Sequence, residues 1–166
     1  MLTWSEFAAR EPELAASGRS LLYQYGVGLA FLGTVRRDGG PRLHPMCPVM
    51  HGDGLYAFLV PGPKRTDLHR DPRFAMHSFP AENDENAFYV TGLAHPVPDA
   101  AVREGAASLF LQERSWDAPP PGFDEQELFE FLIDRALLTT TTGHGDPAPR
   151  HRVWSATRTG PEATAR

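Results

Sequence analysis

The sequence has almost no cysteine, no excess of positive charge and no long hydrophobic run. Cys47 is the single cysteine among 166 residues, which excludes an internal disulfide framework. Lysine and arginine total 16 against 21 aspartate and glutamate residues, and the resulting net charge of −5 disfavours a dedicated nucleic-acid binder. Glycines interrupt every apolar run before it reaches the length of a membrane span, and no signal-peptide pattern opens the chain. We therefore expect a cytoplasmic protein.

Motifs of metal and nucleotide enzymes are also missing. The seven histidines are scattered without the paired spacing of a zinc-binding helix, so no metal site is predicted. Neither a glycine-rich dinucleotide fingerprint nor a Walker sequence occurs. His44 lies three positions before Cys47, and on a strand this spacing puts the two side chains on opposite faces. We therefore predict no catalytic nucleophile and interpret Cys47 as a small buried apolar residue.

Proline and glycine instead divide the chain into short apolar runs. The 16 prolines and 15 glycines disfavour a helical bundle. Strands are predicted over 28–37, 41–50, 55–60, 73–79, 87–97, 136–142 and 151–157. Helices are predicted near 3–10, 12–25, 64–70 and 102–110, and a further helix after the capping pair Asp124 and Glu127. Antiparallel strands in this number, with helices near the ends, favour a small barrel with helical decorations.

Residues 61–68 (Pro-Gly-Pro-Lys-Arg-Thr-Asp-Leu) combine a strand end, a tight turn and a short helix. That helix begins with Lys64, Arg65 and Thr66. The N-terminus of a helix offers unpaired N–H groups and a partial positive charge, so these side chains could complete a phosphate site. A solvated basic turn is the alternative interpretation.

Residues 41–49 (Pro-Arg-Leu-His-Pro-Met-Cys-Pro-Val) form a predicted strand that contains prolines. Proline cannot donate a hydrogen bond to a neighbouring strand, so we expect a gap or bulge on one side. Such a gap would leave backbone groups available to a flat ligand with polar edges. The alternative is an edge strand that proline protects against aggregation.

The order of these elements resembles the pyridoxamine-phosphate-oxidase-like FMN-binding split-barrel family. The likeness rests on residues 32–42 (Leu-Gly-Thr-Val-Arg-Arg-Asp-Gly-Gly-Pro-Arg), on 63–68 with Asp71-Pro72, and on 88–94 (Phe-Tyr-Val-Thr-Gly-Leu-Ala). It covers about residues 10–97, with 151–157 as the last strand. The resemblance implies a mainly β (α+β) fold, an antiparallel split β-barrel of six to seven strands with peripheral helices. This single domain would span residues 1–158, followed by a disordered tail over 159–166.

The resemblance also implies a homodimer with flavin sites at the subunit interface. The ring of FMN would lie against the strand of residues 41–49, its phosphate would lie near Lys64, and the last strand of the other subunit would approach it. The cofactor-binding residues implied are Arg42, His44, Pro45, Met46, Cys47, Lys64, Arg65, Thr66, Arg152 and Trp154. The implied activity is that of an FMN-dependent oxidoreductase with a small-molecule substrate, because the cofactor itself carries the redox chemistry.

Two departures from the oxidase pattern bear on the substrate. Gly62-Pro63 stands where the oxidase has Ser-Arg, and Cys47 stands where it has a second lysine. Two cationic phosphate anchors are therefore missing, which argues against pyridoxamine phosphate as the substrate.

Two other functions remain open at this point. One is a deazaflavin-dependent reductase, in which the acidic tail of the cofactor would need a basic groove. Candidates for that groove are Arg36, Arg37, Arg42, Lys64 and Arg65. The other is a non-catalytic protein that holds flavin or haem.

Overall fold

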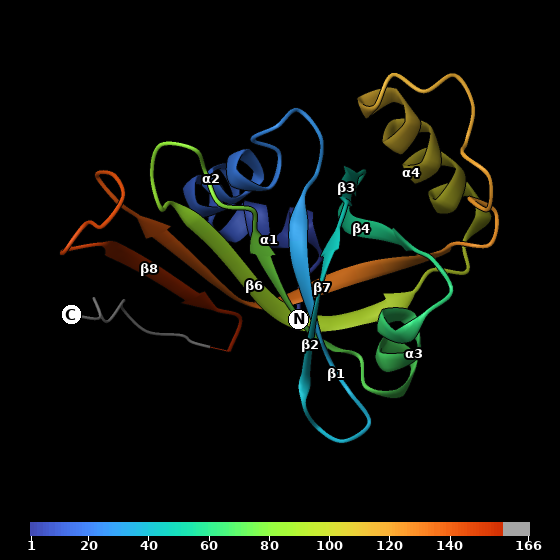
Figure 1. Ribbon diagram of the computed structural model, residues 1–166, viewed down its shortest axis with the longest axis horizontal. Helices are drawn as coiled ribbons and strands as arrows, with labels where there is room; N and C mark the ends of the chain where they lie inside the picture. The colour runs from blue at the N-terminus through green and yellow to red at the C-terminus, as the bar shows by residue number, and fades with distance from the viewer. Residues whose placement is uncertain (158–166) are drawn as a thin grey trace.

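The chain alternates antiparallel strands with short helices over residues 1–157, the part that this computed structural model describes (Figure 1). The elements are α1 (Trp4–Arg10), α2 (Pro12–Leu22), β1 (Ala30–Val35), β2 (Pro41–Met46), β3 (Pro48–His51), β4 (Gly54–Leu59), α3 (Pro63–Arg70), β5 (Arg73–Ser78), β6 (Ala87–Pro96), α4 (Ala100–Glu113), β7 (Glu127–Thr140) and β8 (Arg150–Ser155). The tail predicted over 159–166 lies outside the described residues. None of the helices within 1–157 is long and apolar enough to cross a membrane.

The strands form one curled sheet in the order β2-β1-β5-β6-β7-β4-β3, and β8 pairs with the second half of β7. The two ends of this order, β2 and β3, are neighbours in the sequence and are joined by Cys47 alone. The chain therefore crosses at Cys47 from one edge of the sheet to the other, and the sheet takes the shape of a split barrel. The predicted mainly β split-barrel class is confirmed.

The single strand predicted over 41–50 is wrong in one respect, because the structure divides it at Cys47. β2 pairs with β1, whereas β3 pairs with β4 at the opposite end of the sheet. A chain that changes partners within one residue cannot keep one continuous ladder. The division accounts for the eighth strand within residues 1–157.

The helix predicted after Asp124 and Glu127 is also wrong, because residues 127–140 form the long strand β7. Both faces of this strand are covered near its start, because Leu128 packs into the apolar cluster under α4 and Phe129 into the main core, so the simple alternation of a strand is hidden. β4 and β6 pair with its two edges. Tertiary pairing thus overrides a local pattern that also fits a helix.

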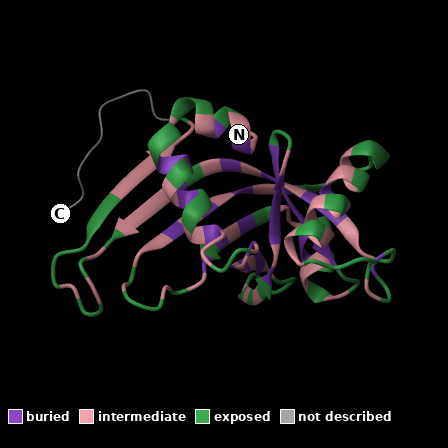
Figure 2. Ribbon diagram, turned by 90° about the horizontal axis from the view of Figure 1, so that it is seen from above, coloured by how far each residue is buried: buried purple, intermediate pink, exposed green. Residues whose placement is uncertain are grey.

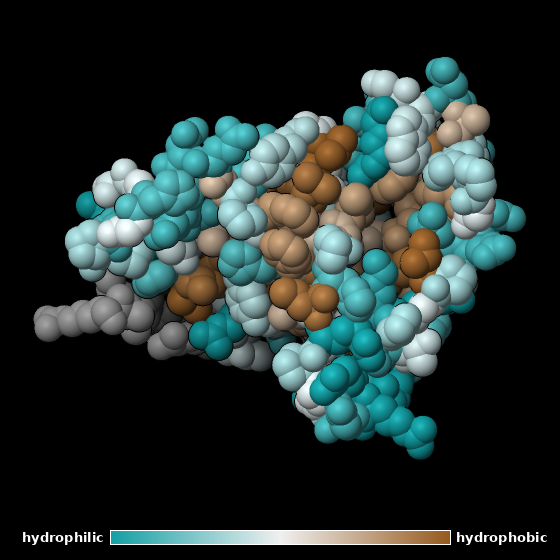
Figure 3. All heavy atoms as spheres, in the orientation of Figure 1, coloured by the Kyte–Doolittle hydropathy of each residue, from teal (hydrophilic) through white to brown (hydrophobic). Residues whose placement is uncertain are grey.

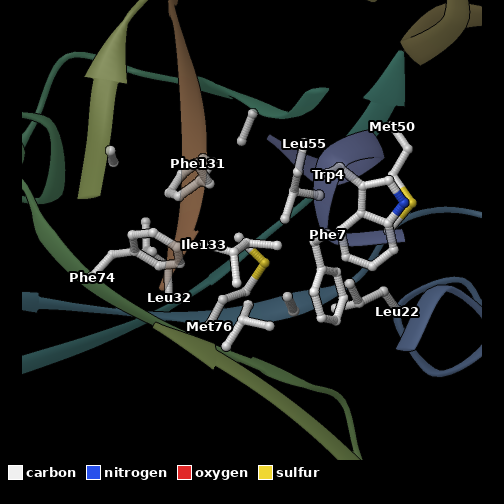
Figure 4. Packing of buried hydrophobic residues seen from close by; sticks show 14 of the residues in the cluster. Trp4, Phe7, Leu22, Leu32, Met50, Leu55, Phe74, Met76, Phe131 and Ile133 are labelled. Carbon is white, nitrogen blue, oxygen red and sulfur yellow. The ribbon is translucent and has the colours of Figure 1, made fainter. Parts of the chain in front are cut away.

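The main core fills the inside of the curled sheet. Figure 4 shows Trp4 and Phe7 of α1 and Leu22 of α2 next to Leu32, Met76 and Ile133 from the strands. α1 begins with a capping box, in which Thr3 Oγ1 accepts from the Glu6 N–H and Glu6 accepts from the Thr3 N–H.

Gly18 explains how closely α2 packs onto the sheet. A Cβ atom at this position would lie 2.5 Å from the ring of Phe88. A glycine in the middle of a helix normally weakens it, but here it allows the close approach. Figure 2 shows the distribution of burial, with buried positions along the strands and exposed residues in the loops.

A smaller apolar cluster lies under α4, separate from the main core. It consists of Val49, Tyr56, Phe58, Ala106, Phe123 and Leu128. The proline-rich residues 118–122 lie in the connection from α4 to β7. This cluster holds α4 against β3 and β4, and so fixes the β3 side of the Cys47 junction.

Candidate functional site

The start of α3 offers backbone donors without partners. Gly62 precedes the helix and supplies no side-chain cap, and Pro63 occupies the first helical position. The N–H groups of Lys64 and Arg65 follow in the first turn, where an α-helix has no internal acceptors for them. The first turn of α3 therefore has the geometry of an anion site.

Lys64 adds a cation to this first turn. It is the only lysine in the sequence, since the other 15 basic residues are arginines. The side chain is half-buried, and burial lowers the pKa of its ammonium group, while the nearby Cys47 acts in the opposite direction. Within the described residues Lys64 has neither an ion pair nor a hydrogen bond. A partly buried ammonium without a counter-ion is unfavourable, and a bound anion would remove that cost.

Arg65 and Thr66 follow Lys64 but bind groups of the protein itself. Arg65 donates from Nη1 to the carbonyl of Glu125 at 2.9 Å, and its Nε lies 3.7 Å from the carboxylate of Glu127. The hydroxyl of Thr66 donates to the carbonyl of Gly62 at 3.2 Å. The side chain of Arg65 therefore points towards β7, and the hydroxyl of Thr66 is occupied by its hydrogen bond to Gly62.

Arg42 fixes α3 to the β1–β2 hairpin. Its Nε lies 2.7 Å from Oδ2 of Asp67, which also accepts from the hydroxyl of Thr34 at 3.1 Å. Arg70 lies 3.2 Å from the other carboxylate oxygen. Burial by itself would raise the pKa of Asp67, but the hydrogen bonds from Arg42, Thr34 and Arg70 hold it below its usual value. Sequence reasoning missed Asp67, whose signal was its place between basic residues on a short helix.

The remaining predicted residues of β2 lie where the barrel is split. Met46 is buried in the core, Pro45 is exposed, and Cys47 is half-buried at the junction with β3. Nε2 of His44 is buried and has no hydrogen-bond partner among the described residues. A buried polar atom without a hydrogen bond destabilises the folded state, and a ligand that bonds to it would offset this cost. Cys47 and Lys64 therefore lie close to each other at the junction, and His44 lies three residues before it on β2.

Arg152 and Trp154 lie elsewhere in the chain. Both are on β8, which Figure 1 places at the opposite side of the molecule from α3. Arg152 pairs with Glu11 at 2.7 Å and Glu13 at 3.2 Å, and the ring of Trp154 lies 5.0 Å from that of Phe7. A single chain does not bring these two residues to the corner at Lys64.

The outer face of the sheet carries a feature that the sequence analysis did not identify. A hollow of about 310 Å³ is lined by Gly33, Ala75, Tyr89 and Thr91, among others. Gly33 and Ala75 are opposite each other on β1 and β5, and their small side chains leave the space open. A glycine inside a predicted strand was the available signal for such a feature.

Neither a protein-family model nor a curated protein sequence matches this chain. Solved structures do match. A FAD-binding protein from Mesorhizobium loti is 21% identical with a TM-score of 0.56, over 74% of this chain and 91% of that one. An F420 reductase is 22% identical with a TM-score of 0.57, over 70% of this chain and 94% of that one. A heme-binding protein from Mycobacterium smegmatis is 15% identical with a TM-score of 0.60, over 84% of this chain and 57% of that one.

These matches define the fold. Together with a candidate pyridoxamine 5′-phosphate oxidase from Listeria innocua, they are split-barrel proteins of the pyridoxamine-phosphate-oxidase-like type. The resemblance stated from residues 32–42, 63–72 and 88–94 is thereby confirmed at the level of the fold. The proteins of this fold differ in the cofactors that their names record.

Proposed function

We propose that this protein is an FMN-binding oxidoreductase, with the phosphate of FMN at the start of α3. The observation that carries the proposal is Lys64, a half-buried cation without a partner among the described residues, at an uncapped helix N-terminus. The FAD-binding protein among the structural neighbours supports a flavin on this fold. The substrate would be a small molecule of a class that these residues do not define.

The residues at the corner fit a phosphorylated flavin. The ammonium of Lys64 and the N–H groups of the first helical turn supply charge-assisted hydrogen bonds to a phosphate. Within the described residues His44 offers a ring nitrogen without a partner, and Pro45 and Pro48 limit backbone pairing on either side of Cys47. A bound flavin would supply the redox chemistry, and the protein would bind and orient it.

We also propose a homodimer formed through the outer face of the sheet. Six directly opposed residues cross this face from β2 to β8: Pro45, Phe31, His77, Tyr89, Leu137 and Val153. None of the six is fully buried in the single chain. Leu43 is 66% exposed beside the hollow at Gly33 and Ala75. In a two-fold dimer, Leu43 of each subunit could enter the hollow of the other.

The single lysine permits a direct test of the proposed phosphate position. An amine-reactive reagent can acylate only Lys64 and the α-amino group, and mass spectrometry separates the two products. We expect saturating FMN to slow acylation of Lys64 about tenfold and to leave the α-amino group unchanged, because the ammonium would be held by phosphate. Equal acylation with and without bound FMN would place the phosphate elsewhere.

The absorption spectrum of the purified protein distinguishes the other cofactors of the fold. Flavin, deazaflavin and haem absorb in different parts of the visible and near-ultraviolet spectrum. We expect flavin bands after reconstitution. A deazaflavin band or a Soret band in their place would contradict the FMN assignment and favour a deazaflavin-dependent reductase or a haem-binding protein.

A further inference from the structure

A tyrosine hydroxyl covers the free edge of β3. Within residues 1–157, β3 ends the sheet and pairs with β4 along one edge only. On the other edge, the hydroxyl of Tyr23 accepts from the Met50 N–H at 2.9 Å and donates to the carbonyl of Pro48 at 3.4 Å. These two backbone groups lie two residues apart and point to the same edge, as the groups that bond to a neighbouring strand do. Tyr23 therefore takes the place of a neighbouring strand directly after Cys47.

Glu113 of α4 contacts the same hydroxyl. It is the last residue of the helix, its side chain is 13% exposed, and it shares a hydrogen bond with Tyr23. Its Oε2 atom is buried and has no hydrogen-bond partner among residues 1–157. Figure 1 shows β3 between the loop that follows α2 and helix α4, and Figure 3 shows mainly hydrophobic residues on the surface there. One hydroxyl thus connects the end of α2 with β3 and α4.

The surroundings of Glu113 disfavour its ionised form. Burial raises the pKa of its carboxyl, which also lies at the C-terminal end of a helix, where the partial negative charge disfavours an anion. The hydrogen bond from Tyr23 and the guanidinium groups of Arg114 and Arg19 lower this pKa by less. Nη1 of Arg114 lies 3.5 Å from Oε2, and the guanidinium of Arg19 lies 5.1 Å from the centre of the Tyr23 ring. The protonated form of Glu113 therefore persists to higher pH than that of an exposed glutamate.

The protonation of Glu113 decides where the Tyr23 proton goes. Burial and the negative charge of Glu113 raise the pKa of the Tyr23 hydroxyl, so this group keeps its proton at neutral pH. Ionised Glu113 accepts that proton in a hydrogen bond and competes for it with the carbonyl of Pro48. Protonated Glu113 instead donates to the Tyr23 oxygen, which leaves the Tyr23 proton for Pro48 and a lone pair for the Met50 N–H. All four groups have a partner only when Glu113 is protonated.

We infer that Tyr23 and Glu113 form a proton-controlled latch that positions the Cys47 junction, closed when Glu113 is protonated and open when it is ionised. The closed latch fixes the carbonyl of Pro48, the residue that follows Cys47. Cys47 lies close to Lys64, so the latch also regulates the phosphate position, and this consequence rests on the proposed function. FMN therefore binds more tightly when the latch is closed.

Carbon NMR of the chain without FMN tests the latch itself. From about pH 5 to about pH 8, above the ordinary pKa of a glutamate, the carbonyl carbon resonance of Pro48 should shift as the Tyr23 proton leaves it. Glu113→Gln carries an amide that donates to Tyr23 at every pH, so its Pro48 resonance should stay at the acid value of the wild type. Tyr23→Phe removes the donor, so its Pro48 resonance should not titrate.

Glu130 and His51 provide the controls for this titration. Glu130 is a half-buried glutamate of β7 whose pKa is also raised by burial, and Glu130→Gln should leave the Pro48 titration unchanged. His51 of β3 lies against Gly105 of α4, about 12 Å from Glu113 along the helix axis at 1.5 Å per residue. A Pro48 resonance that does not titrate in the wild type would overturn the latch. A resonance that still titrates in Glu113→Gln would also overturn it and assign the pH dependence to His51.

Fluorescence titration with FMN separates the latch from the proposed function. The ratio of the Glu113→Gln affinity to the wild-type affinity should rise about two- to tenfold over the same pH range, as for one neutral hydrogen bond. This ratio cancels the ionisation of the FMN phosphate itself. A constant ratio beside a titrating Pro48 would overturn the regulation of the phosphate position. A titrating Pro48 in a chain that binds no FMN would contradict the proposed function and leave the latch intact.

Discussion

At the scale of single residues, the proposed phosphate contact depends on Lys64. A phosphate carries close to two negative charges, and a hydrogen bond to a charged group contributes about 1.5–3 kcal/mol. Arg65 lies against Glu127, and Arg42 is paired with Asp67. Lys64 is therefore the cation near Cys47 that is available for the proposed phosphate. We expect Lys64→Ala to weaken FMN binding about 10- to 100-fold, since about 1.4 kcal/mol is a factor of ten. Fluorescence titration measures both affinities.

Riboflavin and Cys47 provide the controls for this variant. Riboflavin lacks the phosphate, so its affinity should be nearly the same for the wild type and Lys64→Ala. Cys47→Ser changes the neighbouring side chain without removing a cation, and FMN affinity should stay within a few fold. Unchanged FMN affinity in Lys64→Ala, or equal weakening of both ligands, would make Lys64 a surface cation. A complete loss in Cys47→Ser would show that the thiol has a direct role.

At the scale of elements, the position of α3 depends on the buried carboxylate of Asp67. Asp67→Asn should lower the free energy of unfolding by about 2 kcal/mol at neutral pH. This is less than the 3–5 kcal/mol of a fully buried pair, because the two guanidinium groups are about one-third exposed. Urea denaturation measures the loss.

The pH dependence of this contribution has a defined sign. The hydrogen bonds of Asp67 hold its pKa below the ordinary value, so the folded state binds this proton less readily than the unfolded state. The stabilisation is therefore complete above about pH 4 and is lost as the pH falls below it. The difference between wild type and Asp67→Asn should shrink over the same range. Asp117→Asn, which changes an exposed carboxylate without an ion pair among the described residues, is the control, and an equal loss there would contradict the role of Asp67.

The elements also show which parts of the fold the sequence can predict. The hairpin turn at Asp38-Gly39-Gly40 and helix α3 follow local rules of turn and helix chemistry, and both are correct. The failures are at Cys47 and at residues 124–132, where strands from distant parts of the chain decide the structure. Cys47 entered the candidate site only through the family resemblance, whereas Lys64 was also predicted as a site residue from local pattern. The contact between Arg65 and Glu127 was not predicted, because it depends on how β7 packs beside α3.

At the scale of the whole molecule, the proposed dimer would link assembly to cofactor binding through the outer face of the sheet. Leu43 lies on β2, the strand that ends at the Cys47 junction, and is 66% exposed in the single chain. A dimer that buries this face would therefore cover the flank of the proposed flavin site. The residues of β8, which a single chain keeps away from Lys64, could approach that site only from the second subunit.

Leu43→Glu should separate the two subunits. Burying a leucine side chain contributes about 1.5–3 kcal/mol, and the two-fold symmetry doubles the effect while adding a charge to each apolar hollow. Sedimentation should therefore show a dimer for the wild type and a species of 18.3 kDa for the variant. FMN affinity should fall together with the dimer, whereas Lys64→Ala should lose FMN affinity and remain dimeric. Trp116→Glu, at another exposed apolar position near α4, is the control. A monomeric wild type would contradict the proposed dimer, and a monomeric Leu43→Glu that binds FMN normally would show that the cofactor site is complete within one chain.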